Sequence, residues 1–353
     1  MAASISELER VYQMLEDEES QFTYLNRLNY LISGDCSFID RIVERYLPEL
    51  PIWGRTTPEQ FLAKLPADRQ IVLFGAGISG RGVLPTFQND KRFLGFCSST
   101  EEKQKNGFLG WPVMSPEELL SRRDLTVVIS SADAKQEIQQ ILQAGGYPPE
   151  QVFTLDGLTT SYNDQYFGPS FLRYEPEEVF VDAGCCNLRS ALALRAHCGH
   201  VKKVYAFEPE PENYKVCLRN REKYKFPEVE LFSFGVWSER TTLHFSAGNA
   251  AVSCISEEGT SSVPVMPIDE AVDPNERVTF IKMDIEGSEL EALKGAQQTI
   301  QRDKPKLAIC IYHKPEDMTE IPLYIKSLVP EYRLYVRHHS NRCSETVLYA
   351  VMP

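Results

Sequence analysis

Three carboxylate side chains, Asp284, Glu286 and Glu289, stand close together directly after an apolar run of the chain. The run, residues 278–281, is apolar or β-branched, which is typical of a strand buried between helices. After Gly287 the apolar residues recur at helical spacing, so the carboxylates lie where a strand turns into a helix. Open α/β sheets bind their ligands at such carboxyl ends, which makes this turn a candidate active site. The alternative is an acidic loop that only caps the following helix.

A histidine, His313, follows a second apolar run, residues 307–312, which predicts that it emerges at the same sheet edge as Asp284. An imidazole that titrates near neutrality could take a proton from a substrate hydroxyl, with Asp284 or Glu286 orienting the ring. The same residues could instead hold a divalent metal that acidifies the hydroxyl. The simplest alternative is that His313 only hydrogen-bonds a neighbouring loop.

Another strand–turn–helix pattern runs over residues 179–190 and contains Asp182 and Gly184. The next apolar run, residues 204–207, ends in Glu208, which lies 24 residues beyond Gly184. Nucleotide-binding folds place an acidic residue on ribose hydroxyls at about this spacing. A carboxylate suits that task because it accepts two hydroxyl hydrogen bonds at once. The glycine would let the backbone approach a ligand, and Asp182 could meet an ammonium group.

A glycine-rich turn, with Gly75, Gly77 and Gly80 followed by Arg81, comes between an apolar strand and a helix in the first half of the chain. Such a turn lets a phosphate approach a helix N-terminus. A nicotinamide dinucleotide fold would place a carboxylate after the next strand, where this chain has Cys97. We therefore expect a nucleotide or nucleotide-sugar pocket, with Arg81 near a phosphate. The alternative is a degenerate module kept for architecture or dimerisation.

The spacing of these patterns predicts an α/β protein with two Rossmann-like, doubly wound domains and an N-terminal helical segment. We place the helical segment at residues 1–66, the nucleotide-binding-like domain at 67–160 and the second domain at 161–353. The boundary falls in a connector rich in turn residues. The second sheet should be mostly parallel, with an antiparallel hairpin at its edge. His338 and His339 end the first hairpin strand and are competing candidates for the base, although at a hairpin we expect them to be solvated.

Composition excludes several classes of protein. The chain has 353 residues, 42% of them hydrophobic and 25% charged, as in a globular protein with a substantial core. A net charge of −13 argues against a nucleic-acid-binding surface, and no apolar run approaches membrane-spanning length. Nine cysteines without a disulfide framework fit a reducing compartment. We therefore expect a cytoplasmic protein with no nucleic-acid or membrane partner.

The N-terminal helical segment carries an apolar stripe from Phe22 to Leu31 and has no sheet of its own. An amphipathic helix needs something to cover that stripe. A second copy of the chain would cover it in a homodimer, which we expect. The alternative is that the stripe packs on its own chain.

From about Val179 onward the chain resembles the FkbM family of S-adenosylmethionine-dependent methyltransferases, which have a Rossmann-like fold. The resemblance lies in short motifs that occur in the family's order and spacing. They are Val181-Asp182-Ala183-Gly184, Ala206-Phe207-Glu208-Pro209, Ile281 to Leu290, Leu293-Lys294-Gly295-Ala296, Tyr312-His313 and Glu345 to Ala350. One position departs from the pattern, because Leu188 stands near the end of the first loop where the family usually has a glycine. Residues 70–150 are more loosely similar to nucleotide-binding-like domains found ahead of such methyltransferases.

The resemblance implies a site for S-adenosyl-L-methionine. Asp182 and Gly184 would border its methionine end, and Glu208, followed by Pro209, would hold its ribose. Leu188 narrows the loop, so the cofactor would sit differently there or bind weakly.

The positions of the strands suggest roles for the remaining site residues. Trp237 follows the next strand, and its side chain would pack against the adenine ring. The alternative is that Trp237 is buried in the hydrophobic core. Asp284 would lie beside the methyl group, where the acceptor enters, with His313 and Glu286 as its catalytic companions.

The function implied is methylation of a hydroxyl on a small molecule, sugar or natural product, with a divalent metal as an optional second cofactor. Two other functions stay open from the residues alone. One is a non-catalytic nucleotide- or cofactor-binding protein whose altered first loop still holds a ligand. The other is a nicotinamide-dependent oxidoreductase that uses the glycine-rich turn of the first domain.

Overall fold

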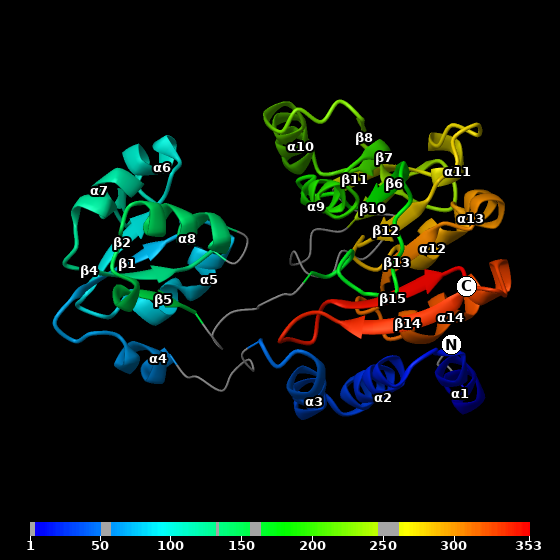
Figure 1. The fold of residues 1–353 in the computed structure, drawn as a ribbon, viewed down its shortest axis with the longest axis horizontal. Helices are drawn as coiled ribbons and strands as arrows, with labels where there is room; N and C mark the ends of the chain where they lie inside the picture. The colour runs from blue at the N-terminus through cyan, green and yellow to red at the C-terminus, as the bar shows by residue number, and fades with distance from the viewer. Residues whose placement is uncertain (1–3, 51–57, 132–133, 156–163, 246–260) are drawn as a thin grey trace. The chain divides into compact units, whose positions relative to one another are not determined.

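The chain folds into two compact units, and one of them is assembled from two separate stretches of sequence. The computed structural model describes residues 4–50, 58–131, 134–155, 164–245 and 261–353. Residues 1–47 and 163–353 form the first unit, which we call the discontinuous unit, and residues 48–162 form the inserted unit (Figure 1). The boundary expected between residues 160 and 161 lies outside the described residues.

The inserted unit is built on a parallel five-stranded sheet in the order β3-β2-β1-β4-β5, which confirms the Rossmann-like prediction. Its strands are β1 (Gln70–Phe74), β2 (Phe93–Cys97), β3 (Val113–Met114), β4 (Leu125–Ile129) and β5 (Val152–Thr154). Its helices are α4 (Pro58–Lys64), α5 (Ile78–Phe87), α6 (Glu101–Asn106), α7 (Pro116–Ser121), α8 (Lys135–Ala144) and the short 3-10 helix η1 (Pro149–Gln151). The inner strands β1 and β4 are almost wholly buried, which explains their unbroken apolar sequences.

The discontinuous unit contains a seven-stranded sheet in the order β14-β15-β13-β12-β6-β7-β8. Its strands are β6 (Glu178–Ala183), β7 (Val201–Phe207), β8 (Val229–Phe232), β12 (Phe280–Met283), β13 (Lys306–Cys310), β14 (Arg333–His338) and β15 (Thr346–Val351). β15 runs antiparallel to both of its neighbours, β13 and β14, whereas the other strand pairs of this sheet are parallel, which confirms the predicted hairpin at the sheet edge. A second sheet, of β9 (Gly235–Val236), β10 (Thr241–Phe245) and β11 (Ser261–Met266), was not expected from the sequence.

Helices cover the large sheet of the discontinuous unit. They are α9 (Arg189–Cys198), α10 (Pro211–Lys223), α11 (Ile268–Ala271), α12 (Glu289–Lys294), α13 (Gln297–Asp303) and α14 (Asp317–Leu328). Successive residues of a strand point to opposite faces, so Val179 and Val181 enter one apolar cluster and Phe180 enters the other. Both faces are therefore apolar, and polar groups are left to the strand ends.

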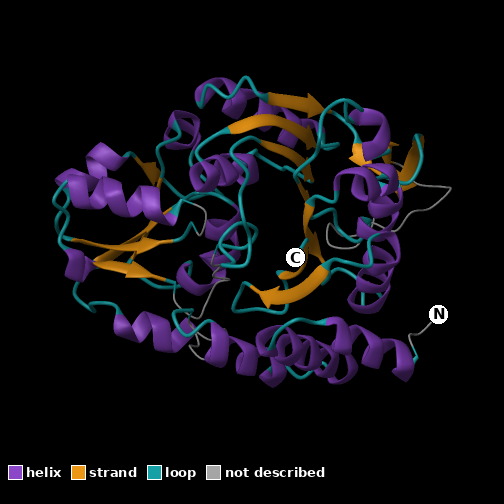
Figure 2. Cartoon of the chain, turned by 45° about the vertical axis from the view of Figure 1, so that its right-hand side comes forward, coloured by secondary structure: helices purple, strands orange, loops and turns teal. Residues whose placement is uncertain are grey.

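The N-terminal helices pack on this unit, and the second of them packs on the edge strand β14 of its large sheet (Figures 1 and 2). They are α1 (Ile5–Met14), α2 (Glu18–Ser33) and α3 (Ser37–Tyr46). Ser20 accepts a hydrogen bond from the Val336 amide at 3.0 Å, and Asp17 pairs with Arg337 at 2.6 Å. An uncovered edge strand would expose unpaired backbone groups, so these helices protect β14.

The apolar stripe of α2 is only partly covered by its own chain. Leu28 and Leu31 pack against the core of the discontinuous unit. Leu25 and Ile32 remain 44% and 82% exposed. The homodimer expected from this stripe stays a prediction. No helix among the described residues is long and apolar enough to cross a membrane.

His338 and His339, expected to be solvated, are instead 2% and 3% exposed. The nitrogen Nδ1 of His338 lies 2.9 Å from the Thr346 hydroxyl, and Nε2 of His339 lies 2.7 Å from the Tyr349 hydroxyl. The turn beyond β14 folds inward, which the hairpin pattern does not reveal. Burial lowers the pKa of His339 to about 3, with a further contribution from Arg337, and lowers that of His338 well below its usual range.

The stability of the discontinuous unit should therefore fall as the pH drops below about 6.5, where histidines of the unfolded chain become protonated but His339 stays neutral. The neutral His339 side chain stabilises the fold at pH values above its pKa in the unfolded chain. This contribution is lost as the pH falls toward the lower pKa that His339 has in the folded protein. We expect His339→Gln to reduce the loss between pH 7.5 and 5.5 by about 1.4 kcal/mol, measured by urea unfolding. The exposed His200 gives the control variant, His200→Gln. Equal losses in His339→Gln and the parent would contradict the prediction.

Candidate active site

Adjacent parallel strands bring the predicted site residues to one edge of the sheet. Strand β12 lies between β6 and β13, with Met283 opposite both Ala183 and Ile309. Gly184 and Asp284 therefore leave the sheet side by side, and the Asp284 amide donates to the Ala183 carbonyl at 3.2 Å.

The turn after β12 is tight and places its three carboxylates in different environments. Glu289 is fully buried at the start of α12 and accepts a hydrogen bond from the Ile285 amide at 2.9 Å. Glu286 has a φ of 57° and its side chain is 85% exposed. Gly287 has a φ of 91°, and a Cβ there would lie 2.9 Å from the Lys314 side chain. The turn thus requires glycine and directs Glu289 inward.

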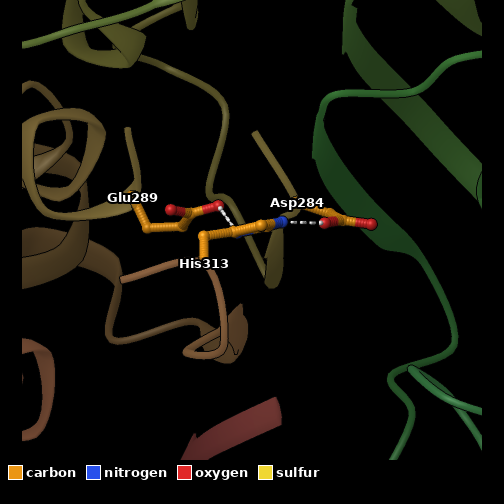
Figure 3. A group of neighbouring side chains, drawn as sticks. All are labelled: Asp284, Glu289 and His313. Carbon is orange, nitrogen blue, oxygen red and sulfur yellow. Dashed lines mark ion pairs between the residues drawn. The ribbon is translucent and has the colours of Figure 1, made fainter. Parts of the chain in front are cut away.

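His313 lies between Asp284 and Glu289 (Figure 3). Its Nδ1 is 2.9 Å from Glu289, and its Nε2 is 3.5 Å from Asp284 and 3.6 Å from Glu286. These are close charge contacts, and neither ring nitrogen forms a hydrogen bond of good geometry. Sequence analysis correctly anticipated that His313 and Asp284 lie together, but it gave Glu289 no role toward the ring.

The surrounding carboxylates change how His313 titrates. Burial by itself would lower its pKa, but Glu289, Asp284 and Glu286 together raise it to about 9. The ring is therefore an imidazolium at neutral pH and can donate a hydrogen bond. The ring can accept a proton only as the pH approaches 9. This pKa is higher than the near-neutral value expected from the sequence.

Asp284 is held ionised by the groups around it. Burial would raise its pKa, but the charges of Lys282 and His313 and the Tyr166 hydrogen bond outweigh burial and lower it. The hydroxyls of Tyr166 and Tyr312 donate to its two oxygens at 2.9 and 3.2 Å. The carboxylate keeps 26% of its side chain exposed, so a ligand can reach it.

A second carboxyl group, Glu345, lies beside this network and was quoted in the family motif without a role. It accepts a hydrogen bond from Gln165 at 2.6 Å and another from the Tyr312 hydroxyl at 3.5 Å. Burial, and then the charge of Asp284, raises its pKa to about 7. Gln165 and Tyr166 come from the connector before β6. In the sequence, only their polar and aromatic side chains could have suggested a role in the site.

Asp182 occupies a different place from the one expected. It is fully buried, accepts a hydrogen bond from Ser190, and forms an ion pair with Lys282 at 3.3 Å. Its carboxylate is therefore committed to groups inside the protein rather than presented to the ammonium of a ligand.

The loop after β6 keeps the shape of a glycine loop even where glycine is missing. Gly184 has a φ of 76°, and a Cβ there would clash with the Asp284 carbonyl oxygen. Leu188 stands at the family's glycine position with a φ of 63°, a left-handed conformation that costs about 1–2 kcal/mol for a residue with a Cβ. The Leu188 side chain packs into the apolar cluster with Ala191 and Leu194. Its burial offsets the backbone strain.

Glu208 is oriented by the same loop. It is 5% exposed, and its two oxygens accept hydrogen bonds from the amides of Cys186 and Glu210, both at 2.9 Å. Burial raises its pKa. Each oxygen retains a second lone pair, so the carboxylate can still accept the two hydroxyls of a ribose. These residues fit an adenosine cofactor.

Two further predicted residues lie close to this loop in sequence or structure. Pro209 follows Glu208 and is half-buried. Trp237 is also half-buried, and its backbone amide donates to the Met266 carbonyl at 3.1 Å. Both leave part of their side chains accessible, as a residue that contacts a bound base requires.

In the inserted unit, the predicted glycine-rich turn connects β1 to α5. Gly75 has a φ of 131°, and a Cβ on Gly80 would clash with the Gly75 carbonyl oxygen, so both are needed for close packing. Gly77 precedes α5 with open space around its Cα. Arg81 is exposed on the first turn of that helix. The four residues lie together at the helix N-terminus, as expected for an anion site.

Three side chains offer atoms for a divalent cation. Ligand atoms of Asp284, Glu289 and His313 all lie within 4.8 Å of one another. Carboxylate oxygens and an imidazole nitrogen suit several divalent metals. A metal at this cluster stays a prediction.

Comparison with known proteins identifies this part of the chain. Residues 182–343 match the family model of the Methyltransferase FkbM domain. The chain is 28% identical over 132 residues to the hexuronic acid methyltransferase AglP of Haloferax volcanii, covering 36% of this chain and 53% of that protein. It therefore spans about half the length of that curated relative. The match confirms the family resemblance for residues 182–343, which lie in the discontinuous unit.

Solved structures with a similar arrangement include two methyltransferases. Methyltransferase FkbM from Methylobacillus flagellatus is 21% identical, with a TM-score of 0.47, and the alignment covers 93% of this chain and 98% of that one. An rRNA methylase from Streptococcus thermophilus is 19% identical, with a TM-score of 0.34, covering 51% and 89% of the two chains.

If Glu289 raises the pKa of His313, then Glu289→Gln should lower it from about 9. The pKa can be read from the imidazole proton shifts of His313 in an NMR titration. Glu286→Gln is the matched control, because its exposed carboxylate is screened by water and should change the pKa less. An unchanged pKa in Glu289→Gln would show that this contact does not govern the ring.

The same titration tests the metal. A divalent cation bound at Asp284, Glu289 and His313 would displace the ring proton, so added Mg²⁺ should lower the pKa of His313 and a chelator should restore it. A titration unaffected by Mg²⁺ would argue against binding of this ion at the cluster.

Proposed function

We propose that the FkbM methyltransferase domain of residues 182–343 transfers a methyl group from S-adenosyl-L-methionine to a hydroxyl of a small-molecule acceptor, such as a sugar or natural product. The observation that carries this proposal is the match of these residues to the family model. The geometry of the candidate site supports it, because groups suited to a nucleoside and to a hydroxyl acceptor lie on adjacent strand ends.

The cofactor side of the site is formed by the loop after β6 and by the end of β7. Glu208 would accept the ribose hydroxyls, and Gly184 would allow backbone contact with the methionine portion. When bound, this cofactor supplies an electrophilic methyl group on a sulfonium. The ionised carboxylate of Asp284 favours a cationic ligand at this site.

The acceptor side is formed by Asp284, His313 and their hydrogen-bonding neighbours. A hydroxyl oxygen that forms a new bond to carbon must lose its proton, and Asp284, an ionised and partly exposed carboxylate, would receive it. The His313 imidazolium would hold the acceptor oxygen or Asp284 by hydrogen bonding. His313 itself would serve as the base only in its neutral form, which becomes appreciable near pH 9.

The ribose contact can be tested by calorimetry with S-adenosylhomocysteine. Glu208→Ala should weaken binding by about 1–3 kcal/mol, because ribose hydroxyls lose their acceptor. Glu210→Ala is the matched control, since Glu210 lies two residues away and caps α10 by accepting from the Asn213 amide. It should leave the affinity near that of the parent. Equal affinities for Glu208→Ala and the parent would remove Glu208 from the ribose site.

The acceptor can be sought in the same preparation. Candidate hydroxyl compounds, including hexuronic acids because of the relative's name, can be screened by release of S-adenosylhomocysteine. A parallel titration with NAD separates the alternative functions. Saturable NAD binding that is lost in Gly77→Val, with no binding of the methyl donor, would favour an oxidoreductase and overturn the proposal.

A further inference from the structure

We infer that Lys282 is a positioning residue that holds the cofactor loop in its binding shape and connects that loop to the acceptor side of the site. This inference rests on the proposed function and adds to it a residue outside the predicted site. Lys282 lies on β12, directly across from Asp182 on β6, and its side chain is only 4% exposed.

The ammonium group of Lys282 contacts three consecutive residues at the end of β6 and the start of the cofactor loop. Its Nζ donates to the Gly184 carbonyl at 2.7 Å and to the Ala183 carbonyl at 3.3 Å. It also forms the 3.3 Å ion pair with Asp182. The ammonium therefore has two carbonyl acceptors and one ion-pair partner at the junction of β6 and the loop. The hydrogen bond from Lys282 to the Gly184 carbonyl therefore stabilises the left-handed backbone conformation of Gly184.

The same side chain reaches toward the acceptor side. The Nζ of Lys282 lies 5.2 Å from the centre of the Tyr166 ring, a cation–π distance. The Tyr166 hydroxyl donates to Asp284 at 2.9 Å. Lys282 therefore contacts the loop that would hold the cofactor and the tyrosine that orients the acceptor carboxylate, without reaching the ligand itself.

A buried charge with these contacts cannot move independently of the loop. Burial opposes the ammonium, but Asp182 and Asp284 raise its pKa, so Lys282 stays charged. Removing the charge leaves Asp182 buried without its partner and the Gly184 carbonyl without its donor. The loop should then sample other conformations and bind the cofactor more weakly, although every proposed ligand contact is still present.

The chain provides a matched control in Lys306. This residue forms a buried ion pair with Glu178 at 3.0 Å, with side chains 11% and 0% exposed. Its Nζ lies 5.7 Å from the Phe280 ring. Lys306 and Glu178 begin strands β13 and β6, so this pair lies at the amino ends of the strands, opposite the candidate site. The Lys306–Glu178 pair therefore matches the buried ion pair and the aromatic contact of Lys282, but it does not contact the cofactor loop.

The experiment compares Lys282→Met with Lys306→Met. We expect both to unfold at lower temperature, whereas only Lys282→Met should bind S-adenosylhomocysteine at least tenfold more weakly in calorimetry. Hydrogen exchange of the peptide that contains Gly184 should accelerate in Lys282→Met and not in Lys306→Met. If Lys282→Met does not fold, the double variant Asp182→Asn/Lys282→Met removes both charges and takes its place, with the same tenfold loss expected.

An affinity within twofold of the parent, in whichever of these variants folds, would overturn the inference. So would an equal loss of affinity in Lys306→Met, because the effect would then be one of general stability. Failure of the parent itself to bind S-adenosylhomocysteine would instead refute the proposed function, so the two failures are distinguishable.

Discussion

The arrangement of the candidate site depends on how the buried ammonium of Lys282 is compensated. A charge removed from water must find opposite charge and hydrogen-bond acceptors within the protein. Neighbouring strands are about 4.8 Å apart, so Asp182 on β6 is within reach of Lys282 on β12. This pairing explains why Asp182, which looks like a ligand contact in sequence, is turned inward. Asp284, which keeps 26% of its side chain exposed, and Glu208 at the end of β7 are left to meet ligands.

Much of the site could be predicted because parallel strands place their carboxyl ends together. That rule alone brings Asp284, Gly184, Glu208 and His313 to one edge once the strands are recognised. It does not say which carboxylate points inward, since this depends on the partner across the strand. Nor does it give the pKa of His313, which reflects three carboxylates at separate positions of one turn. The pKa shift depends on the distances between these charged groups in the folded protein, and the spacing of the residues in the sequence does not give those distances.

Other features were missed because their partners are far away in sequence. Gln165 and Tyr166 reach the site from an irregular connector, and Glu345 reaches it from the end of the last hairpin turn. The burial of His338 and His339 likewise depends on groups that pack over that turn. An apolar repeat of two or 3.6 residues predicts which face of a single strand or helix is buried. The contacts described here depend instead on how distant segments pack in the tertiary fold.

Backbone strain is concentrated at the same edge. Seven non-glycine residues among those described have a positive φ, and four of them are Cys186, Leu188, Glu286 and Glu345. All four lie in the loops that surround the proposed ligand sites. Such conformations persist only where the surrounding packing and hydrogen bonds maintain them. Here Glu286 and Glu345 carry carboxylates, so the strained backbone determines where negative charge is presented.

The division of one unit between two stretches of sequence has a consequence for synthesis of the protein. Ser20 finds its partner, the Val336 amide, 316 residues later in the chain. During translation, α1, α2 and α3 emerge first, and the inserted unit can fold while they still lack the strand on which they pack. Their polar contacts with β14 form only when the last hairpin leaves the ribosome. Until then the nascent chain carries helices with an exposed apolar face, which makes them natural targets for a chaperone.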